Sequence, residues 1–581
     1  MRSVAFAAGL SLILFAGCAE RASRPAPSPV GRLAESTACS TLDVSDDLHW
    51  EVSGRNGAVA TGSAGSVAAG IEILQSGGNA ADAAAATLIA LAVTEPTKYG
   101  LGGEVPIMVY QSAPKTLEVI CGQGEAPALA TLEYFQSIGG IPRPGKNLDV
   151  TNSNRNAAVP GAFHAILMLL DNYGTMTFAQ VAAPSIRLLA KYSDGWQADL
   201  CRTLSTLVAA DADVRANGAT RSAGIAAVAY EFYGRDGAIA RRIVAWSEAS
   251  GGLLRADDLA NHATRIEEPV SVRCRGYTVY KCGPWTQGPW LLETLRILEG
   301  YNLRRMGHDS ADYVHVVAEA MKLGLADRDA YLADPDFADV PLSEMISPRY
   351  ARIRRPLIDM KHASLEVRPG DPRKMKALAA PRIDSTATKG PVSDTTTCIV
   401  ADRWGNVIVA TPSGWGGALA GDTGIWLGSR LSSLNTWPGH PNVVAPGKRP
   451  RTTLTPTLVF KNGKPVIAVS VAGGDMQDQV TLNLLLDVID FGMPPGEAVS
   501  AARFGTSHLT DSFGQAPPKL GSLEINPQVG DKVIDDLKSR GHAVTTVEGA
   551  YWAPSMMVFD PRDGSIRAAG DPAASRHSAA Y

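Results

Sequence analysis

The residues best suited to chemistry lie at the start of a predicted β-hairpin. Two runs rich in β-branched and apolar residues, Asp394–Asp402 and Val407–Thr411, flank a Gly-Asn turn, and this pattern predicts antiparallel pairing. If the inner ends of the two runs pair with each other, Thr395 lies opposite Gly414 and next to Ser413. A threonine at the head of one strand then meets a hydroxyl group from the partner strand, an arrangement that suits a nucleophile.

The bond between Asp394 and Thr395 is the predicted site of self-cleavage. Cleavage there would leave the new α-amino group of Thr395 beside its own hydroxyl group. An α-amine has a pKa of about 7.7–8.0, so at neutral pH a useful fraction is the unprotonated base that the hydroxyl group needs. Alternatively, the threonines are present only because a β-branched residue suits a pleated strand.

The composition excludes some classes of function. The chain has 581 residues, of which 45% are hydrophobic and 19% charged, as in an ordinary globular protein with a sizeable core. Its net charge of −4 provides no basic surface for nucleic acid. The 10 histidines form no cluster with metal-ligand spacing, and we expect neither a metal nor another cofactor. The cysteines after Cys18 match no redox motif, and we assign no disulfide.

The beginning of the chain has the pattern of an export signal. A basic start, Met1–Ser3, precedes an apolar run, Val4–Phe15, that is too short to span a bilayer. The run leads to Cys18 in a sequence that resembles a bacterial lipobox, so residues 1–18 are predicted to be a lipoprotein signal peptide with Cys18 as the lipidated residue. An ordinary secretory signal is the alternative. We expect a periplasmic protein, anchored in the outer membrane through a flexible tether at residues 19–46.

Alternating helical and strand patterns predict a layered arrangement of helices and sheets. Helices are expected at Ser66–Gln75, Ala80–Leu91, Phe163–Asn172, Phe178–Tyr192, Trp290–Leu298, Tyr313–Ala326 and Gln479–Ile489. Strands are expected at Ala58–Thr61, Ile107–Tyr110, Val270–Cys282, Thr457–Phe460, Val466–Val471 and Ser555–Phe559. The segment Ser364–Pro391 has little periodicity and is expected to be an exposed linker, so that a processing site at its end can be reached.

Short motifs in a fixed order extend from Ala58 to Tyr581. They are Gly77–Ala83, Glu95–Gly103, Val159–Gly161, Tyr173–Met176, Lys448–Pro450, Ala472–Gly474 and Gly570–Tyr581. Together they resemble the gamma-glutamyltransferase family, also called gamma-glutamyl transpeptidases, of N-terminal-nucleophile hydrolases. Gly283–Gly288 and Pro438–Asn442 resemble its divergent branch, often called gamma-glutamyltransferase-like, which includes amidohydrolases for small non-glutamyl amides. By composition alone, these two segments are ordinary Gly/Pro turns.

The resemblance implies an α+β fold, a four-layer αββα sandwich formed by two subunits cleaved from one precursor. Residues 47–394 would form the large subunit, and residues 395–581 the small catalytic subunit. The expected partners are therefore the two subunits of the same precursor and a small-molecule amide substrate. A membrane would be contacted only through the N-terminal lipid anchor.

The same resemblance assigns the catalytic roles. Thr395 matches the nucleophile, and its freed α-amino group matches the general base. Ser413 stands where the family usually has a second threonine, whose hydroxyl group bonds to the nucleophile. Gly473 and Gly474 match the oxyanion-hole glycines, whose backbone N–H groups can approach a tetrahedral oxyanion closely. Without the family context, this glycine pair is equally a turn after a strand.

Departures from the family pattern indicate an unusual substrate. Gln123 stands at the position of the arginine that holds the α-carboxylate of a glutamyl substrate, and Ser432 or Ser433 at that of the acid that holds its α-amino group. Both charged anchors are missing, so glutathione is expected to be a poor substrate. Trp415 replaces a usual asparagine and makes the pocket more apolar.

Three other positions are expected to contact the substrate. Thr452 and Thr453 occupy the place of a family serine pair that helps to hold the substrate, although strand propensity also explains them. Arg430 replaces a usual glutamine, and its guanidinium group is suited to gripping a carboxylate. The alternative for Arg430 is a solvated side chain or an ion pair with a nearby acid such as Asp422.

Three functions fit these observations. The first is an autoprocessing amidase or acyltransferase that forms an acyl-enzyme on Thr395 and cleaves an amide other than a standard gamma-glutamyl one. The second is a true gamma-glutamyltransferase or glutathione hydrolase with altered head-group anchors. The third is a non-catalytic periplasmic binding lipoprotein, and the intact Thr395, Ser413, Gly473 and Gly474 argue against it.

Overall fold

The structure of this chain, a computed structural model, describes residues 50–142, 154–381, 395–414 and 417–581. These residues belong to one compact unit, Thr41–Tyr581. The predictions for the signal peptide, for lipidation of Cys18, for the tether and for Asp394 and Trp415 lie outside the described residues. Within the described ranges, no helix combines the length and the apolar character that crossing a membrane requires.

Two seven-stranded antiparallel sheets form the centre of the fold. The first has the strand order β17 (His577–Ala580), β2 (Gly57–Thr61), β8 (Cys398–Asp402), β9 (Val407–Ala410), β3 (Val105–Gln111), β4 (Thr116–Gly122) and β5 (Arg265–Glu267). The second has the order β1 (Glu51–Gly54), β16 (Ile566–Gly570), β15 (Ala553–Phe559), β11 (Lys464–Ala472), β10 (Thr457–Lys461), β7 (Tyr277–Lys281) and β6 (Val270–Cys274). A small third sheet contains β12 (Phe504–Gly505), β13 (Ser522–Ile525) and β14 (Ala543–Thr546).

The two large sheets pack against each other through apolar side chains. Met108 and Ile399 of the first sheet share a buried cluster with Leu458 and Met557 of the second sheet. Successive side chains of a strand point to opposite faces, so Val400, next to Ile399 on β8, belongs to the core on the helix side. Each large sheet is therefore apolar on both faces and must be covered by helices on its outer side.

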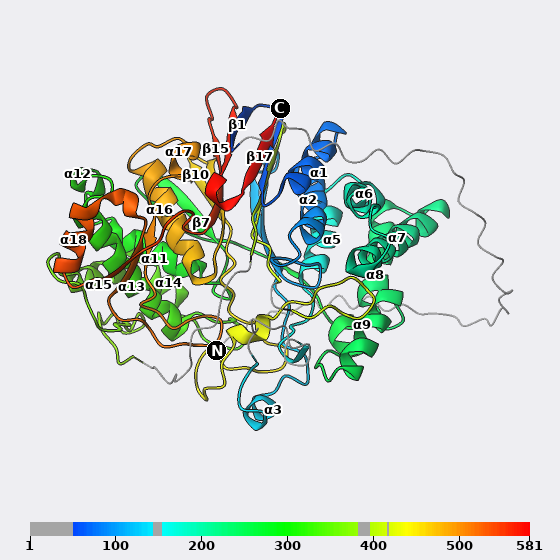
Figure 1. Ribbon diagram of the computed structural model, residues 1–581, viewed down its shortest axis with the longest axis horizontal. Coiled ribbons are helices and arrows are strands. Elements are labelled where there is room, and N and C mark those ends of the chain that lie inside the picture. The colour runs from blue at the N-terminus through cyan, green and yellow to red at the C-terminus, as the bar shows by residue number, and fades with distance from the viewer. Residues whose placement is uncertain (1–49, 143–153, 382–394, 415–416) are drawn as a thin grey trace, which may run out of the picture. The chain divides into compact units, whose positions relative to one another are not determined.

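Helices cover the outer face of each large sheet (Figure 1). The helices on the side of the first sheet are α1 (Ala64–Gln75), α2 (Ala80–Thr94), α5 (Ala162–Tyr173), α6 (Phe178–Leu189), α7 (Gly195–Ala216), α8 (Arg221–Tyr233) and α9 (Ala238–Ala249). The main helices on the side of the second sheet are α11 (Gly288–Leu298), α13 (Ala311–Tyr331), α15 (Pro348–Arg354), α16 (Gln477–Ile489) and α18 (Asp531–Ser539). Shorter helices are α3 (Leu132–Ser137), α10 (Ala256–Ala260), α12 (Leu303–Met306), α14 (Leu342–Met345) and α17 (Pro495–Ala498). These layers confirm the predicted αββα sandwich.

The first part of the expected linker is fastened to the fold rather than exposed throughout. Arg354, a buried residue of α15, donates hydrogen bonds to the carbonyl groups of Arg368 and Ala377 at 2.7 and 2.6 Å. Arg368 also forms an ion pair with Glu319 of α13 at 2.9 Å. Buried cations of this kind satisfy backbone groups that have no helix or sheet partner. Residues 364–381 are therefore fastened at these points, although several of their side chains, such as Leu365 and Leu378, are exposed as predicted.

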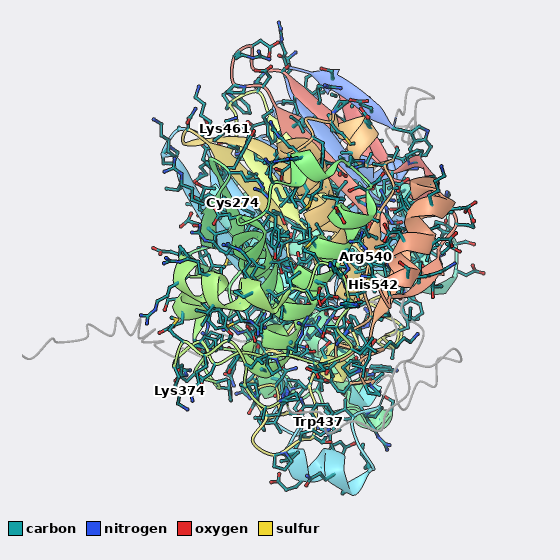
Figure 2. The ribbon with its side chains drawn as sticks, turned by 90° about the vertical axis from the view of Figure 1, so that its left-hand side faces the viewer. Cys274, Lys374, Trp437, Lys461, Arg540 and His542 are labelled. Atoms are coloured by element: carbon teal, nitrogen blue, oxygen red, sulfur yellow. The ribbon has the colours of Figure 1, made fainter. Side chains whose placement is uncertain are left out.

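The segment just before this linker is held by residues that follow α18. The backbone carbonyl group of Arg540 accepts the Ala363 N–H at 2.7 Å, and its side chain donates from Nη1 to the Met360 carbonyl group at 3.2 Å. His542, labelled with Arg540 in Figure 2, contacts His315 of α13 at 2.8 Å. Residues on both sides of the predicted cleavage site are thus joined by contacts that do not depend on the bond at that site.

Candidate active site around Thr395

The predicted hairpin forms, with a register that differs by one residue from the expected one. Ala401, not Asp402, pairs with Val407 on the adjacent strand β9. When this register is continued beyond the strands, Ser413 rather than Gly414 lies opposite residue 395, which brings the two predicted hydroxyl groups directly across from each other.

The shift follows from the way in which the turn is capped. The Asp402 carboxylate accepts hydrogen bonds from the N–H groups of Trp404 and Asn406 at 2.9 and 3.0 Å. Gly405 has a φ of +82°, which glycine adopts without the penalty that other residues have. A three-residue loop with a glycine in this region is a common hairpin connection, and it replaces the expected two-residue turn.

Thr395 is buried beside Ser413. The Thr395 hydroxyl group donates to Ser413 Oγ at 3.4 Å, and the two residues are 1% and 0% exposed. The Thr395 N–H donates to the Lys98 carbonyl at 3.3 Å. Thr395 has a φ of +87°, a region that a β-branched residue occupies only under strain. The backbone is therefore strained on the C-terminal side of the predicted cleavage site.

Ser413 is held by a buried ion pair. Arg430, at the start of the short helix η2 (Arg430–Ser433), donates from Nη2 to Ser413 Oγ at 3.0 Å. Arg430 Nε lies 2.7 Å from Glu104 Oε1, and Glu104 also exchanges both backbone hydrogen bonds with Ser413. The two charged side chains are 3% and 2% exposed. Arg430 is therefore not solvated, and the alternative of an ion pair with an acid holds, with Glu104 as the partner. Asp422, the acid named as an example, pairs with Arg242 instead.

The glycine pair follows β11 and lies next to Thr395. Gly473 has a φ of +148°, and a Cβ atom on it would lie 2.6 Å from the Trp552 ring. When the Gln477 amide is oriented so that both of its groups are hydrogen bonded, its oxygen accepts the Gly474 N–H at 3.1 Å. The same Gln477 atom lies 3.4 Å from Thr395 Oγ1. The Gly474 N–H is therefore directed at a side-chain oxygen that lies 3.4 Å from the candidate nucleophile, which places the predicted oxyanion-hole glycines close to Thr395.

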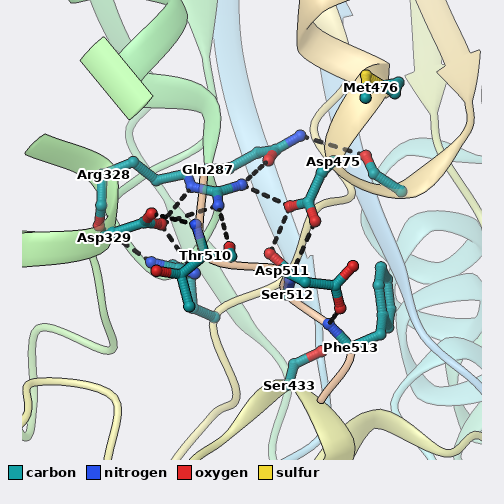
Figure 3. A network of polar contacts seen from close by, with 12 residues as sticks. Gln287, Arg328, Asp329, Ser433, Asp475, Met476, Thr510, Asp511, Ser512 and Phe513 are labelled. Carbon is teal, nitrogen blue, oxygen red and sulfur yellow. Dashed lines mark hydrogen bonds and ion pairs between the residues drawn. The ribbon is translucent and has the colours of Figure 1, made fainter. Parts of the chain in front are cut away.

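A buried network fixes the segment after Gly474. Asp475 accepts hydrogen bonds from the N–H and hydroxyl groups of Ser512 at 2.9 and 2.6 Å and forms an ion pair with Arg328. Figure 3 shows Arg328 between Asp475 and Asp329. Burial raises the pKa of Asp475, but Arg328 and the Ser512 hydrogen bonds outweigh burial and lower it below the ordinary value. The charged carboxylate therefore fixes the residue that directly follows the glycine pair.

A cavity of about 420 Å³ opens on Thr395. One side is apolar and includes Trp552, Val547 and Ala550, and the charged residues at the wall are Lys98, Arg576 and Glu524. Cavities of this size accommodate small molecules. The cavity can therefore bring a ligand with an apolar part next to the candidate nucleophile.

Glu95 lies between the two cations of this cavity. It accepts a hydrogen bond from Arg576 Nη1 at 3.1 Å, and further ones from Lys98 and Thr396. Arg576 also donates to Thr396 Oγ1 at 2.8 Å. Burial raises the pKa of Glu95, but Arg576 and Lys98 outweigh burial and lower it below the ordinary value. These contacts tie the residue after Thr395 to the end of α2 and to the start of β17.

Sequence reasoning did not assign roles to Glu95, Lys98, Arg576 or Gln477. Glu95 and Lys98 lie within the motif Glu95–Gly103, and Arg576 lies within Gly570–Tyr581. The sequence therefore marks these two segments as family motifs but does not indicate what the three side chains do. Glu95 and Arg576 are 481 positions apart, and their contact becomes visible only in the fold.

The predicted substrate-binding residues that the structure describes are buried, and none of these lines the cavity around Thr395. Gln123 donates to the Gly124 carbonyl at 3.0 Å. The Thr452 hydroxyl group accepts the Leu454 N–H at 3.2 Å, and Thr453 reaches the site through its carbonyl group, which accepts from Gln477 at 3.1 Å. Ser433 ends η2, which begins with Arg430. In the described residues, no group of three or more His, Cys, Asp or Glu side chains could hold a metal ion.

Comparisons with known proteins assign the chain to a family. The family model for gamma-glutamyltranspeptidase matches residues 66–206 and 196–581. The chain is 30% identical over 558 residues to a glutathione hydrolase proenzyme of Bacillus subtilis, with 91% of each chain covered. It is also 30% identical over 574 residues to an acylase ACY 1 proenzyme of a Pseudomonas species, with 94% of this chain and 95% of the relative covered.

A solved structure of cephalosporin acylase from Bacillus halodurans superimposes with a TM-score of 0.74 at 27% identity and covers 95% of this chain and 99% of that one. The fold and the matches along nearly the whole chain point to the same family. The chain is therefore an enzyme that belongs to the gamma-glutamyltranspeptidase family of N-terminal-nucleophile hydrolases.

Proposed function

We propose that this chain is a self-processing amidase that uses Thr395 as an N-terminal nucleophile. The observation that carries the proposal is the position of Thr395 Oγ1, 3.4 Å from Ser413 Oγ and 3.4 Å from an amide atom that the Gly474 N–H contacts. The closeness of the candidate nucleophile, its hydroxyl partner and the candidate oxyanion donor supports a role in acyl transfer.

The processing step uses the strained backbone at Thr395. Oγ1 attacks the carbonyl carbon of the preceding residue, and its proton passes by way of Ser413 to the nitrogen of that peptide bond. The acyl group moves from nitrogen to oxygen, which forms an ester and frees the α-amino group. Water then hydrolyses the ester, leaving a carboxylate on the large subunit, residues 47–394, and an N-terminal Thr395 on the small subunit, residues 395–581.

The substrate step repeats this chemistry on another amide. The α-amino group of Thr395 takes the Oγ1 proton, and the oxygen adds to the substrate carbonyl. Backbone N–H groups of Gly473 and Gly474 stabilise the oxyanion. Its collapse expels the amine, which receives the proton from the α-ammonium group, and water then releases the acyl group as a carboxylic acid.

The buried ion pair supports Ser413 in both steps. Arg430 and Thr395 both donate to Ser413 Oγ, at 3.0 and 3.4 Å, so that oxygen faces a full positive charge while it accepts from the nucleophile. A charged donor stabilises negative charge on the oxygen that it contacts. Arg430 therefore acts through Ser413 and is a positioning residue rather than a substrate ligand.

The proposed substrate is a small amide other than a standard gamma-glutamyl compound. Gln123 and Ser433 are neutral at the positions where the resemblance expects the two head-group charges. The cavity beside Thr395 has Trp552, Val547 and Ala550 on its apolar side, which suits an amide with an apolar part. The relatives include an acylase as well as glutathione hydrolases; the latter favour gamma-glutamyl hydrolysis as the second candidate function.

A screen of amide substrates tests this assignment. The purified protein should hydrolyse at least one apolar N-acyl amide and leave glutathione almost unchanged, and Thr395→Ala should be inactive on both. Glutathione turnover that exceeds turnover of every other amide would favour the second candidate.

Localisation is a separate proposal, a periplasmic lipoprotein anchored through Cys18, and it rests on the lipobox-like sequence alone. Radiolabelled palmitate incorporation that persists in Cys18→Ala would exclude it.

A further inference from the structure

A second cavity, of about 580 Å³, opens at the other end of the two large sheets. Its walls include the hairpin turns at Lys115 and Arg403, the start of β11 at Lys464, and the connection from β1 to β2 that contains Arg55. Arg403 follows β8, whereas Thr395 precedes it, so a strand length of roughly 20 Å separates the two cavities. The two cavities share no lining residue, and this second cavity is therefore a separate site.

The floor of this cavity is apolar. Tyr110, Val407 and Ile566 line it and also belong to the buried cluster between the sheets. Phe559 packs against the same cluster, and Phe460 meets the Tyr110 ring edge-on with centroids 5.2 Å apart. The cavity is an opening into the end of the core. An apolar group that leaves water to enter it gains a favourable transfer free energy of about 25 cal/mol per Å² of buried apolar surface.

The rim of the cavity is positively charged. Lys115, Arg403 and Lys464 are exposed and form no ion pair with any described residue. The Arg403 guanidinium group lies 4.4 Å from the centroid of the Trp404 ring, which is 48% exposed. A guanidinium group stacked on an indole keeps its outer N–H groups available for a carboxylate.

The acids at the rim are already engaged. Asp402 accepts hydrogen bonds from the N–H groups of its own turn and from the Ala80 N–H at 2.9 Å. Asp560 pairs with Arg562 at 2.6 Å, and this contact lowers the pKa of Asp560 to about 2. Neither acid neutralises the lysines and arginine at the rim, which are left to attract an anion from outside.

We propose that this cavity binds a small amphipathic organic anion. Its apolar body would enter between the sheets, and its carboxylate or sulfonate would meet Arg403, Lys464 and Lys115. The cavity volume lies within the range of small-molecule sites, roughly 300–1,000 Å³. The site is independent of the proposed amidase chemistry, so its test does not depend on enzyme activity.

Fluorescence of anilinonaphthalene sulfonate added to the purified protein tests the site. We expect saturable binding at one site, displacement by decanoate, and affinity that is weaker by about tenfold or more in Arg403→Glu/Lys464→Glu. Lys532→Glu/Lys538→Glu, on the exposed face of α18, makes the same change of charge elsewhere and should bind like the wild type. Trp404→Ala removes the aromatic platform without changing charge and should also weaken binding.

Equal affinity in the rim variant and the α18 control would overturn the proposal. So would a protein that binds vesicles of anionic phospholipid but not free decanoate, because the rim would then face a membrane surface rather than a small ligand. Thermal unfolding checks the fold of each variant. If Arg403→Glu/Lys464→Glu has a lowered Tm, the neutral variant Arg403→Gln/Lys464→Gln replaces it, and wild-type affinity there would equally overturn the proposal.

Discussion

Arg430 donates a hydrogen bond to Ser413 Oγ at 3.0 Å while its guanidinium group is held by Glu104. A buried charge that loses its partner typically costs about 3–5 kcal/mol. A single substitution at this pair therefore lowers both stability and activity, and the two effects are mixed in the measured rate. A change that removes both charges together separates the two effects.

Arg430→Met is expected to lower the Tm sharply, because Glu104 would stay buried and charged. Arg430→Met/Glu104→Gln should recover most of the Tm but not kcat, because Ser413 still lacks its charged donor. We expect kcat of the double variant to fall by roughly tenfold to a hundredfold, the equivalent of about 1.5–3 kcal/mol. Wild-type kcat in the stable double variant would show that the ion pair only supports the fold.

Ser413→Ala is expected to slow self-cleavage and to lower kcat, whereas Ser413→Thr should keep both. Alanine removes the oxygen that accepts from Thr395 and Arg430, and threonine retains it. The expected loss of kcat for alanine is roughly tenfold to a hundredfold. Time courses of cleavage on a denaturing gel, together with amidase rates, measure the two effects. Equal behaviour of the two variants would remove the hydroxyl group from the mechanism.

Gly473→Ala is expected to reduce kcat by roughly a hundredfold or more, the loss typical of a disturbed oxyanion hole. The new Cβ would lie 2.6 Å from the Trp552 ring, at a φ of +148° that favours glycine. Gly473→Ala/Trp552→Ala relieves the contact but not the backbone strain, and should recover only part of the activity. Wild-type kcat in Gly473→Ala, measured under single-turnover conditions, would contradict this role for the glycine.

Glu95 is expected to make stability depend on pH in the acid range. Its pKa is lowered below the model-peptide value of 4.5 in the folded protein, so its contribution is present above about pH 4.5 and is lost as the pH falls through the folded pKa. Glu95→Gln should therefore lower the Tm at pH 7, and the difference from the wild type should shrink below pH 4. Arg187→Gln breaks a partly exposed ion pair with Glu72 and is the control for the loss of an ion pair outside the site. A Tm difference for Glu95→Gln that is the same at both pH values would contradict the assignment.

Local patterns in the sequence predict the parts of the fold that local physics controls. The alanine-rich composition predicts a helix at Ala80–Leu91, and α2 is observed at Ala80–Thr94, where Asn79 caps its start with hydrogen bonds to two backbone N–H groups. The hairpin of β8 and β9 is predicted by two runs of β-branched and apolar residues on either side of a turn. Its register was wrong because the Asp402 side chain caps the turn, a choice that pairing of strand patterns does not reveal.

Long-range contacts explain most of what the sequence did not predict. Arg430 and Glu104 are 326 positions apart. No feature of the neighbouring sequence distinguishes an arginine in a buried ion pair from an arginine that binds a substrate carboxylate. Helices α7, α8 and α9, between Gly195 and Ala249, were not expected either. The apolar residues of α7 and α8 do not follow one clear stripe, and these two helices are stabilised mainly by packing against each other and against α5 and α6.

N-terminal sequencing of the smaller polypeptide from the purified protein tests the central claim most directly. The account predicts two polypeptides, the smaller of which begins at Thr395, and one uncleaved polypeptide in Thr395→Ala. A smaller polypeptide that begins at another residue, or a wild-type protein that stays in one piece while it hydrolyses amides, would contradict it.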